Sequence, residues 1–119
     1  MSEQRFRKRI QEEILRHLSE IVEFEARDPV LRNAFPTVMD VRLSPDGHYA
    51  KVYIALGGEV DDTEAILEAF NRDRGFFRSA LAERLSVRYT PDLRFVFDET
   101  VERAMRWRDL LGQEDPDDN

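Results

Sequence analysis

Residues 71–94 gather arginines around a glycine, Gly75, that interrupts a helical pattern. The six arginines of this segment are Arg72, Arg74, Arg78, Arg84, Arg88 and Arg94. Guanidinium groups bind phosphate oxygens in a bidentate way and stack on flat rings. A helix that begins after the glycine would add the free amides and the dipole of its N-terminus, which favour an anion. This segment therefore predicts a phosphate-binding surface.

The distribution of charge supports that prediction better than the total does. The formal net charge is −7, whereas nucleic-acid-binding domains are usually basic. Residues 72–94, however, carry six arginines against three acids, a net charge of +3, and residues 1–17 carry five basic against three acidic residues, a net charge of +2. Residues 18–71 and 95–119 are acidic, at −7 and −5. The basic charge thus forms two local regions.

Gly75 has two interpretations. A glycine inside a helix costs about 0.5–1 kcal/mol relative to alanine, so its presence calls for a reason. Gly75, Ser79 and Ala82 follow one another at helical spacing as a line of small residues, which Arg74 and Arg78 border. Such a line would let a phosphate backbone approach closely. Alternatively, Gly75 ends the first of two helices as its C′ residue, and the two interpretations are compatible.

The first elements that must hold these residues are a helix and a hairpin. Apolar residues at helical spacing predict a helix from Arg5 to about Ala26, which "RDP" at 27–29 ends, followed by a connector over 30–36. Alternation in "TVMDVRLS" and "HYAKVYIAL" predicts two antiparallel strands around the turn Pro45-Asp46-Gly47. The residues expected to face the core are Phe6, Ile10, Ile14, Leu18, Ile21 and Val22 in the helix, and Met39, Val41, Leu43, Ala50, Val52, Ile54 and Leu56 in the strands.

A broken helix pair and a third strand follow. Asp61, Asp62 or Thr63 can cap the first helix of the pair. Its apolar stripe continues across a break near 71–75, where Asn71 is a further candidate cap. The inward residues are Ile66, Phe70, Phe77 and Leu81 in the helices and Leu93, Phe95 and Phe97 in the strand. The order predicts an α+β protein with helices on one face of a three-stranded sheet.

Length and composition suggest one domain. The 119 residues suffice for a single core. We expect the domain to span 1–111, to include a C-terminal helix at 99–111 with Trp107, and to be followed by a disordered acidic tail at 112–119. No apolar run approaches the roughly 20 residues that span a bilayer, and no cysteine is present. We therefore expect a cytoplasmic protein that does not bind membranes.

Candidate catalytic groups are few. His17 falls on the first helix and His48 near the turn, without the spacing of a metal site. No phosphate-binding loop motif or dinucleotide fingerprint appears in the sequence. We expect no enzymatic activity, no catalytic residue, no metal, no cofactor and no small-molecule substrate.

Several short stretches occur in a characteristic order and spacing over most of the chain, although no single one is a strong motif. They are Arg5 to Ile10, Asp28 to Leu31, Val41 to Gly47, Ala50 to Tyr53, and Gly75-Phe76-Phe77-Arg78 with Leu81, Leu85, Arg88, Pro91, Leu93, Phe95 and Asp98. Together with the order of elements, these stretches resemble the ribosome-binding factor A family.

The resemblance implies a fold and a function. The fold is a type II KH-like domain, α-β-β-α-α-β, with the C-terminal helix added here. The family has an Ala-x-Gly kink between the two helices, which corresponds to Asp73-Arg74-Gly75, so that an aspartate replaces the alanine. The implied function is non-catalytic binding to the free small (30S) ribosomal subunit and its 16S rRNA during late maturation, assisting rRNA processing.

We expect the phosphate contacts to come from cations on the first helix and around the helix pair. Lys51 on the second strand is a further candidate, whereas Arg84 falls near the apolar stripe and is expected to pair structurally. The predicted RNA-binding residues are Arg5, Lys8, Arg9, Lys51, Arg72, Arg74, Gly75, Arg78 and Arg88.

The alternative function is that of an acidic protein-interaction module. Acidic residues at 59–64 and at the C-terminus could meet a basic ribosomal protein, and Tyr49 and Tyr53 lie on the outward face of the second strand. Salt dependence separates the two functions, because binding to a phosphate backbone weakens steeply with salt. In either case nothing in the sequence calls for more than a monomer.

Overall fold

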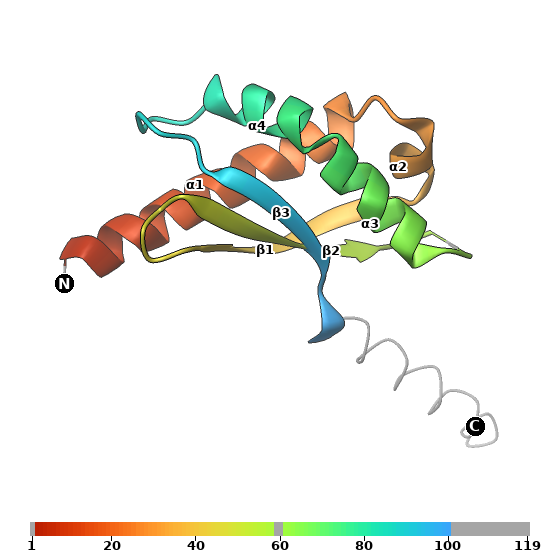
Figure 1. Ribbon diagram of the computed structural model, residues 1–119, viewed down its shortest axis with the longest axis horizontal. Coiled ribbons are helices and arrows are strands. Elements are labelled where there is room, and N and C mark those ends of the chain that lie inside the picture. The colour runs from red at the N-terminus through yellow and green to blue at the C-terminus, as the bar shows by residue number, and fades with distance from the viewer. Residues whose placement is uncertain (1, 59–60, 101–119) are drawn as a thin grey trace, which may run out of the picture.

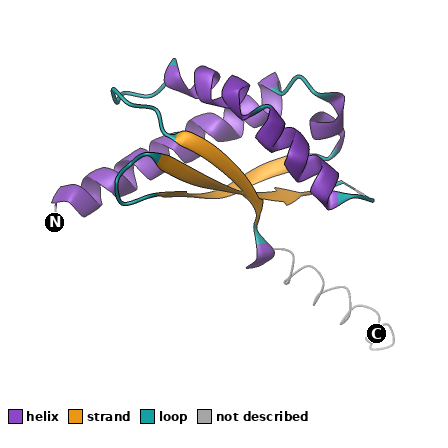
Figure 2. Ribbon diagram, in the orientation of Figure 1, coloured by secondary structure: helices purple, strands orange, loops and turns teal. Residues whose placement is uncertain are grey.

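The computed structural model describes residues 2–58 and 61–100, in which helices lie on one side of a curved sheet (Figures 1 and 2). The predicted α+β fold with the order α-β-β-α-α-β is confirmed, and one short helix, α2, is added to it. The elements are α1 (Ser2–Glu25), α2 (Pro29–Asn33), β1 (Pro36–Leu43), β2 (Tyr49–Leu56), α3 (Thr63–Arg72), α4 (Arg74–Ala82) and β3 (Asp92–Phe97).

The sheet has the strand order β1-β2-β3. β1 and β2 are antiparallel, and the predicted turn joins them with Gly47 at a φ of 77°, a conformation that glycine adopts without strain. β3 is parallel to β2. Because a parallel pair needs a long crossover, the chain between β2 and β3 is where α3 and α4 are placed. This is the type II KH-like topology that the resemblance implied.

The core lies between the sheet and the helices. α1 packs on β1, whereas α3 and α4 pack on β3. Beneath the helix pair, Phe70 of α3, Phe77 of α4 and Phe95 of β3 are fully buried with ring centroids 4.9–5.7 Å apart. Offset ring pairs at this separation stabilise a core beyond the burial of their area. The kinked helix pair is therefore fixed to β3 by aromatic packing.

Two predicted core positions are wrong. Met39 is 41% exposed, because a β-bulge between Val38 and Asp40 inserts an extra residue into β1. A bulge shifts the alternation by one residue, so Val38 and Val41 both face the core. Phe6 is 51% exposed, since the core side of α1 begins only at Ile10.

The segment before β1 differs from its prediction, and little of the segment after β3 is described. Part of the predicted connector is helical, because Asp28 caps α2 by accepting a 3.0 Å hydrogen bond from the Val30 amide and proline suits the first turn. At the other end, Asp98 accepts a 3.0 Å hydrogen bond from the Thr100 amide. The predicted helix at 99–111 and tail at 112–119 lie almost wholly outside the described residues, so the domain bounds stay a prediction.

Candidate nucleic-acid interface

A single residue, Asp73, separates α3 from α4. It is at once the C-cap of α3 and the N-cap of α4, with φ −94° and ψ 12°. Its amide still donates to the Ala69 carbonyl at 3.0 Å, while its carbonyl accepts from the amides of Phe76 and Phe77 at 3.0 and 3.2 Å. The helix axis therefore changes direction while the backbone groups of Asp73 keep their hydrogen bonds.

Gly75 lies in the first turn of α4, not at the end of α3. The interpretation of Gly75 as the C′ residue of the first helix is wrong, since Asp73 is the C-cap of that helix. Only Gly47 among the described glycines has a positive φ, and a Cβ built on Gly75 meets nothing within 4 Å. Neither the backbone nor the packing therefore requires glycine here. What its missing side chain provides is bare helix backbone at the surface.

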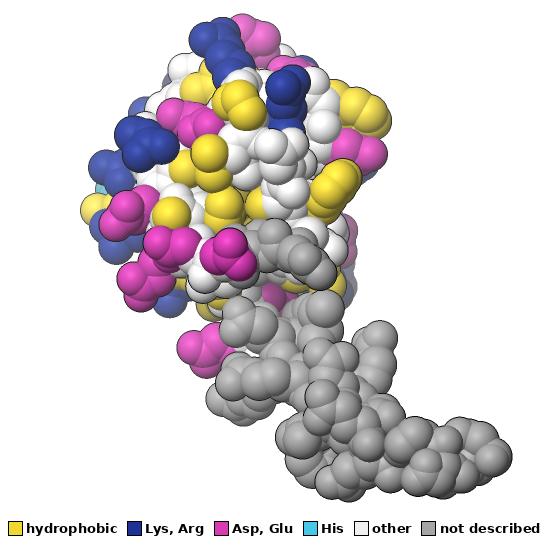
Figure 3. Space-filling model, turned by 90° about the vertical axis from the view of Figure 1, so that its right-hand side faces the viewer, with side chains coloured by type: hydrophobic (Ala, Val, Ile, Leu, Met, Phe, Trp, Pro, Cys, Tyr) yellow, Lys and Arg dark blue, Asp and Glu magenta, His cyan; other side chains and the backbone are white. Residues whose placement is uncertain are grey.

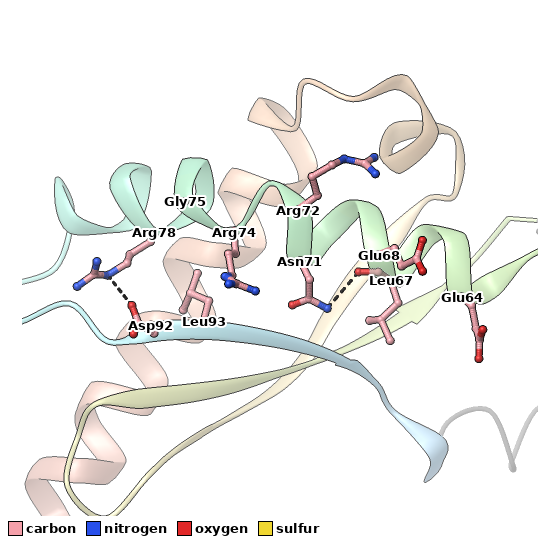
Figure 4. Close-up of a pocket in the computed structure, with 10 residues that line it drawn as sticks. All are labelled: Glu64, Leu67, Glu68, Asn71, Arg72, Arg74, Gly75, Arg78, Asp92 and Leu93. Atoms are coloured by element: carbon pink, nitrogen blue, oxygen red, sulfur yellow. Dashed lines mark hydrogen bonds and ion pairs between the residues drawn. The ribbon is translucent and has the colours of Figure 1, made fainter.

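Two hollows meet at this bare backbone, and together they are called the kink groove. Gly75 and Arg78 line both of them. The larger hollow, of about 730 Å³, is lined by Glu64, Leu67, Glu68, Asn71, Arg72, Arg74, Gly75, Arg78, Asp92 and Leu93 (Figure 4). The smaller, of about 400 Å³, is lined by Gly75, Arg78, Ser79, Ala82, Arg88, Tyr89 and Thr90.

Asn71 ties the groove to the sheet. Its Nδ2 donates to the carbonyls of Leu67 and Phe95, both at 3.1 Å, and its Oδ1 accepts from the Phe95 amide at 3.0 Å. β3 is an edge strand, so these backbone groups would otherwise lack a strand partner. The predicted role of Asn71 as a cap is wrong. Sequence spacing could not show this bridge, because the partner residue lies 24 positions away.

Two of the predicted phosphate-binding arginines already have partners. Arg78 donates from Nε and Nη2 to the carbonyl of Thr90 at 3.0 and 2.8 Å and lies 3.6 Å from Asp92. Arg72 points away from the other groove residues in Figure 4 and lies 3.5 Å from Asp28. The two Arg78 bonds tie the segment before β3 to α4, which gives Arg78 a structural role. The exposed Arg72–Asp28 pair contributes little to stability.

Arg74 and Arg88 are different, because both are exposed and no carboxylate pairs with them in the part of the chain that the structure describes. Arg74 extends from the kink toward β3 (Figure 4). Arg88 and Gly75 both line the smaller hollow. As expected, Arg84 pairs structurally, with Glu25 and with the carbonyl of Ala80 at 2.9 Å.

The groove has a cationic and an acidic end. Glu64 and Glu68 line it on α3, and Asp61 and Asp62 are exposed just before that helix. Figure 3 looks at the end of the molecule where α3 begins and shows acidic side chains gathered on the left of that face. An anion would therefore be attracted to the α4 side of the groove and repelled from the start of α3.

The other predicted residues lie elsewhere. Arg5, Lys8 and Arg9 are exposed on the first two turns of α1, and none of them lines the kink groove. Lys51 is exposed on the sheet face opposite the helices. Sequence reasoning missed Arg94, which lies on that face with its guanidinium carbon 4.3 Å from the centroid of the Tyr49 ring. The alternation of β3 was the signal, because it places Arg94 outward between two core residues.

Metal-binding groups, His17 and helix hydropathy are three further features of the described residues. No group of three or more histidine, cysteine or carboxylate side chains is arranged to hold a metal ion among residues 2–58 and 61–100. His17 has a buried Nδ1 without a hydrogen-bond partner among the described residues. No helix in the same range is both long and apolar enough to cross a membrane.

The fold and the groove define a KH-like domain with a cationic kink between its two central helices. The profile of a family described as ribosome-binding factor A matches residues 6–111. The chain belongs to the ribosome-binding factor A family.

Relatives and solved structures agree with this assignment. The chain is 40% identical over 106 residues to ribosome-binding factor A of Alcanivorax borkumensis, covering 88% of this chain and 76% of the relative. The crystal structure of ribosome-binding factor A from Thermus thermophilus is similar with a TM-score of 0.64 at 31% identity, covering 76% of this chain and 93% of that one. A homology model of the Thermus thermophilus factor, fitted into a cryo-electron microscopy map of a complex with the 30S subunit, has a TM-score of 0.61 at 31% identity, with coverages of 75% and 91%.

Proposed function

We propose that this protein binds the free small (30S) ribosomal subunit through the phosphate backbone of 16S rRNA during late maturation, and that it assists rRNA processing without catalysing a reaction. The proposal includes action as a monomer in the cytoplasm, without cofactor or small-molecule substrate. Its support comes from the family and from a related factor whose coordinates were fitted into a 30S complex.

One observation carries the proposed site. Arg74 and Arg88 are exposed cations without a carboxylate partner in the described ranges, and they flank the bare backbone at Gly75. Guanidinium groups beside a helix N-terminus favour phosphate oxygens. The acidic residues at the start of α3 would turn a phosphate chain away from that end. The kink groove therefore suits a strand of RNA backbone that crosses α4 at Gly75.

The test is co-sedimentation with purified small subunits, with large subunits as a control, at several salt concentrations. The double variant Arg74→Gln/Arg88→Gln removes two unpaired charges. Arg78 is left in place, because its loss would remove two hydrogen bonds to the Thr90 carbonyl and would confound binding with stability. The matched control is Arg16→Gln/Arg32→Gln, which makes the same charge change at two exposed arginines outside the groove.

The groove variant should lose small-subunit binding, and its logarithmic salt slope should fall by about 0.7–0.9 for each phosphate that is no longer neutralised. The control should bind like the wild type. Equal loss in both variants would show that total charge decides binding, and the kink groove would then have no special role. Failure of the wild-type protein to bind small subunits would refute the proposed function itself.

A second candidate function rests on the exposed acids before and along α3, which fit a basic protein partner. Asp61→Asn/Asp62→Asn/Glu64→Gln tests it. If this variant loses subunit binding while the groove variant keeps it, the protein acts through an acidic protein contact. Asp62→Asn still caps α3, because asparagine accepts the amide of Ala65 equally well.

A further inference from the structure

The sheet face that points away from the helices carries a row of three cations. The strand register pairs Arg42 of β1 with Lys51 of β2, and Lys51 with Arg94 of β3. Directly paired residues of neighbouring strands point to the same face, and the strands lie about 4.8 Å apart. All three side chains are exposed. The row therefore crosses the whole sheet on the face that no described helix covers.

This arrangement is unfavourable without a counter-charge, since like charges placed opposite each other destabilise a sheet. Arg42 has one, because its Nε lies 2.9 Å from Asp40 Oδ2. In residues 2–58 and 61–100 no carboxylate pairs with Lys51 or Arg94. Asp92 lies on the same face opposite Tyr49, but its ion-pair partner is Arg78 at 3.6 Å. Two neighbouring cations thus face outward without an ion-pair partner in the described chain, as expected of a surface that meets an anionic partner.

An aromatic ring belongs to the same surface. Tyr49 is 42% exposed, and the Arg94 guanidinium stacks on its ring at 4.3 Å. An exposed ring with a stacked guanidinium is a combination on which nucleic-acid bases stack when they are not paired. Lys51, Arg94 and Tyr49, with Arg42 at the rim, are called the open sheet face.

The open sheet face is continuous with the kink groove around the edge strand β3. A hollow of about 560 Å³ is lined by residues of both, including Arg74 from the kink and Tyr49 and Arg94 from the sheet. A strand that leaves the kink groove past Arg74 would therefore reach Arg94 next. Duplex RNA could not follow this path, because it would have to bend around a single strand of the sheet.

From these observations we infer that the open sheet face binds single-stranded RNA, with an unpaired base stacked on Tyr49 and Arg94 and a phosphate on Lys51. The inference rests on the proposed function and extends it: the protein grips a segment of rRNA that is not paired, and the kink groove and the open sheet face hold successive nucleotides of that segment.

The experiment measures binding of a fluorescein-labelled oligouridylate and of an RNA hairpin stem, alongside small-subunit binding. Tyr49→Val removes the ring and keeps a residue that favours strands, whereas Tyr49→Phe keeps the ring. Lys51→Gln/Arg94→Gln removes the unpaired charges. Arg16→Gln/Arg32→Gln is the charge-matched control, and thermal unfolding verifies that each variant folds.

We expect Tyr49→Val to weaken oligouridylate binding about fivefold or more, which is the usual effect of removing one aromatic ring on which a base stacks. Tyr49→Phe and the control should bind like the wild type. Lys51→Gln/Arg94→Gln should lower the logarithmic salt slope by about 0.7 for each phosphate of the single strand that is no longer neutralised. The hairpin stem should bind more weakly than oligouridylate and should respond less to Tyr49→Val.

Other outcomes overturn the inference in distinguishable ways. If the sheet variants bind RNA and subunits normally while Arg74→Gln/Arg88→Gln does not, the kink groove acts alone and the proposed function stands. If the sheet variants lose subunit binding but keep oligouridylate binding, the face contacts a ribosomal protein. Wild-type protein that binds subunits but not oligouridylate would exclude single-stranded RNA, and wild-type protein that binds no subunits would refute both proposals.

Discussion

The kink groove and the first two turns of α1 are the two regions where the sequence concentrates basic residues, and the fold treats them differently. The groove rests on Phe70, Phe77 and Phe95, and its walls are joined by hydrogen bonds from Asn71 and Arg78. In the α1 turns before Ile10, residues 3–6, 8 and 9 are exposed, and the Arg9 guanidinium carbon lies 5.9 Å from the centroid of the Phe6 ring.

This difference shows what a fold adds to charge. Cations at the end of a helix can attract RNA from a distance, but in the α1 turns before Ile10 no described core residue anchors them to the rest of the fold. Cations around a groove that is anchored to the core have a defined geometry, so each phosphate contact needs less ordering on binding. We therefore expect the groove to decide where RNA binds and the end of α1 to strengthen binding without directing it.

The largest expected effect is on the aromatic support of the groove. Phe77→Ala should lower the free energy of unfolding by about 3–5 kcal/mol, because it opens a cavity beneath α4. Phe6→Ala, the matched change in the exposed α1 turns, should change it by less than about 0.5 kcal/mol. Chemical denaturation of both variants measures the contrast. Similar losses would mean that the α1 turns are also anchored.

Asn71→Ala should lower the free energy of unfolding by about 1–3 kcal/mol, because it leaves the backbone amide and carbonyl of Phe95 without their side-chain partner. Asn71→Asp keeps the acceptor for the Phe95 amide but removes the donor to the Phe95 carbonyl. Its destabilisation should depend on pH and should shrink in acid, because a protonated carboxyl group can again donate a hydrogen bond. Urea denaturation at several pH values measures both. An Asn71→Ala variant with the same free energy of unfolding as the wild type would show that the bridge contributes nothing to holding the groove on β3.

Gly75→Ala should raise the free energy of unfolding by about 0.5–1 kcal/mol, because alanine favours the helix and the added Cβ meets no atom within 4 Å. The same variant should bind small subunits more weakly, since the methyl group covers the bare backbone of the groove. Thermal unfolding measures the expected gain in stability, and co-sedimentation measures the expected loss of binding. Unchanged binding by the more stable variant would remove Gly75 from the proposed interface.

The smallest expected effect concerns the point where α1 becomes anchored. Glu13 accepts hydrogen bonds from the amide and hydroxyl of Ser86 at 3.0–3.1 Å, and the backbone bond chiefly lowers the pKa of Glu13 below its usual value of 4.5. A lowered folded-state pKa stabilises the fold above about pH 4.5, and that stabilisation is lost as the pH falls through the folded-state value.

Glu13→Gln should therefore be slightly less stable than the wild type at neutral pH, and the difference should disappear in acid. Denaturation curves for both proteins across this range are the measurement. A difference that does not change with pH would assign the effect to packing instead of to the carboxylate charge.

Much of the fold could be predicted because its signals are local. Alternation, helical spacing and turn chemistry at Pro45-Asp46-Gly47 depend on neighbours in the chain, and so does the stripe that crosses the break from Phe70 to Phe77. The wrong placement of Met39 has a local reason as well, because a bulge shifts the alternation without a distinct sequence signal. The resemblance to the family supplied the topology.

The candidate site was harder to predict, because an arginine at the surface has the same sequence pattern whether it is paired or free. Arg78 and Arg74 are one helical turn apart, yet Arg78 donates to the Thr90 carbonyl and Arg74 has no carboxylate partner in the described residues. The role of Asn71 depends on a strand 24 residues further along. The RNA contacts themselves stay a prediction until binding is measured.

The sequence by itself determined α1, α3, α4 and the three strands, the family and the segregation of basic from acidic charge, because each of these depends on residue type and spacing along the chain. Only the tertiary structure decided which cations are free, that Gly75 is bare backbone and not a helix end, and that Lys51 and Arg94 are neighbours on one face. Side-chain partners and strand register depend on contacts between distant parts of the chain, and these exist only once the core has brought those parts together.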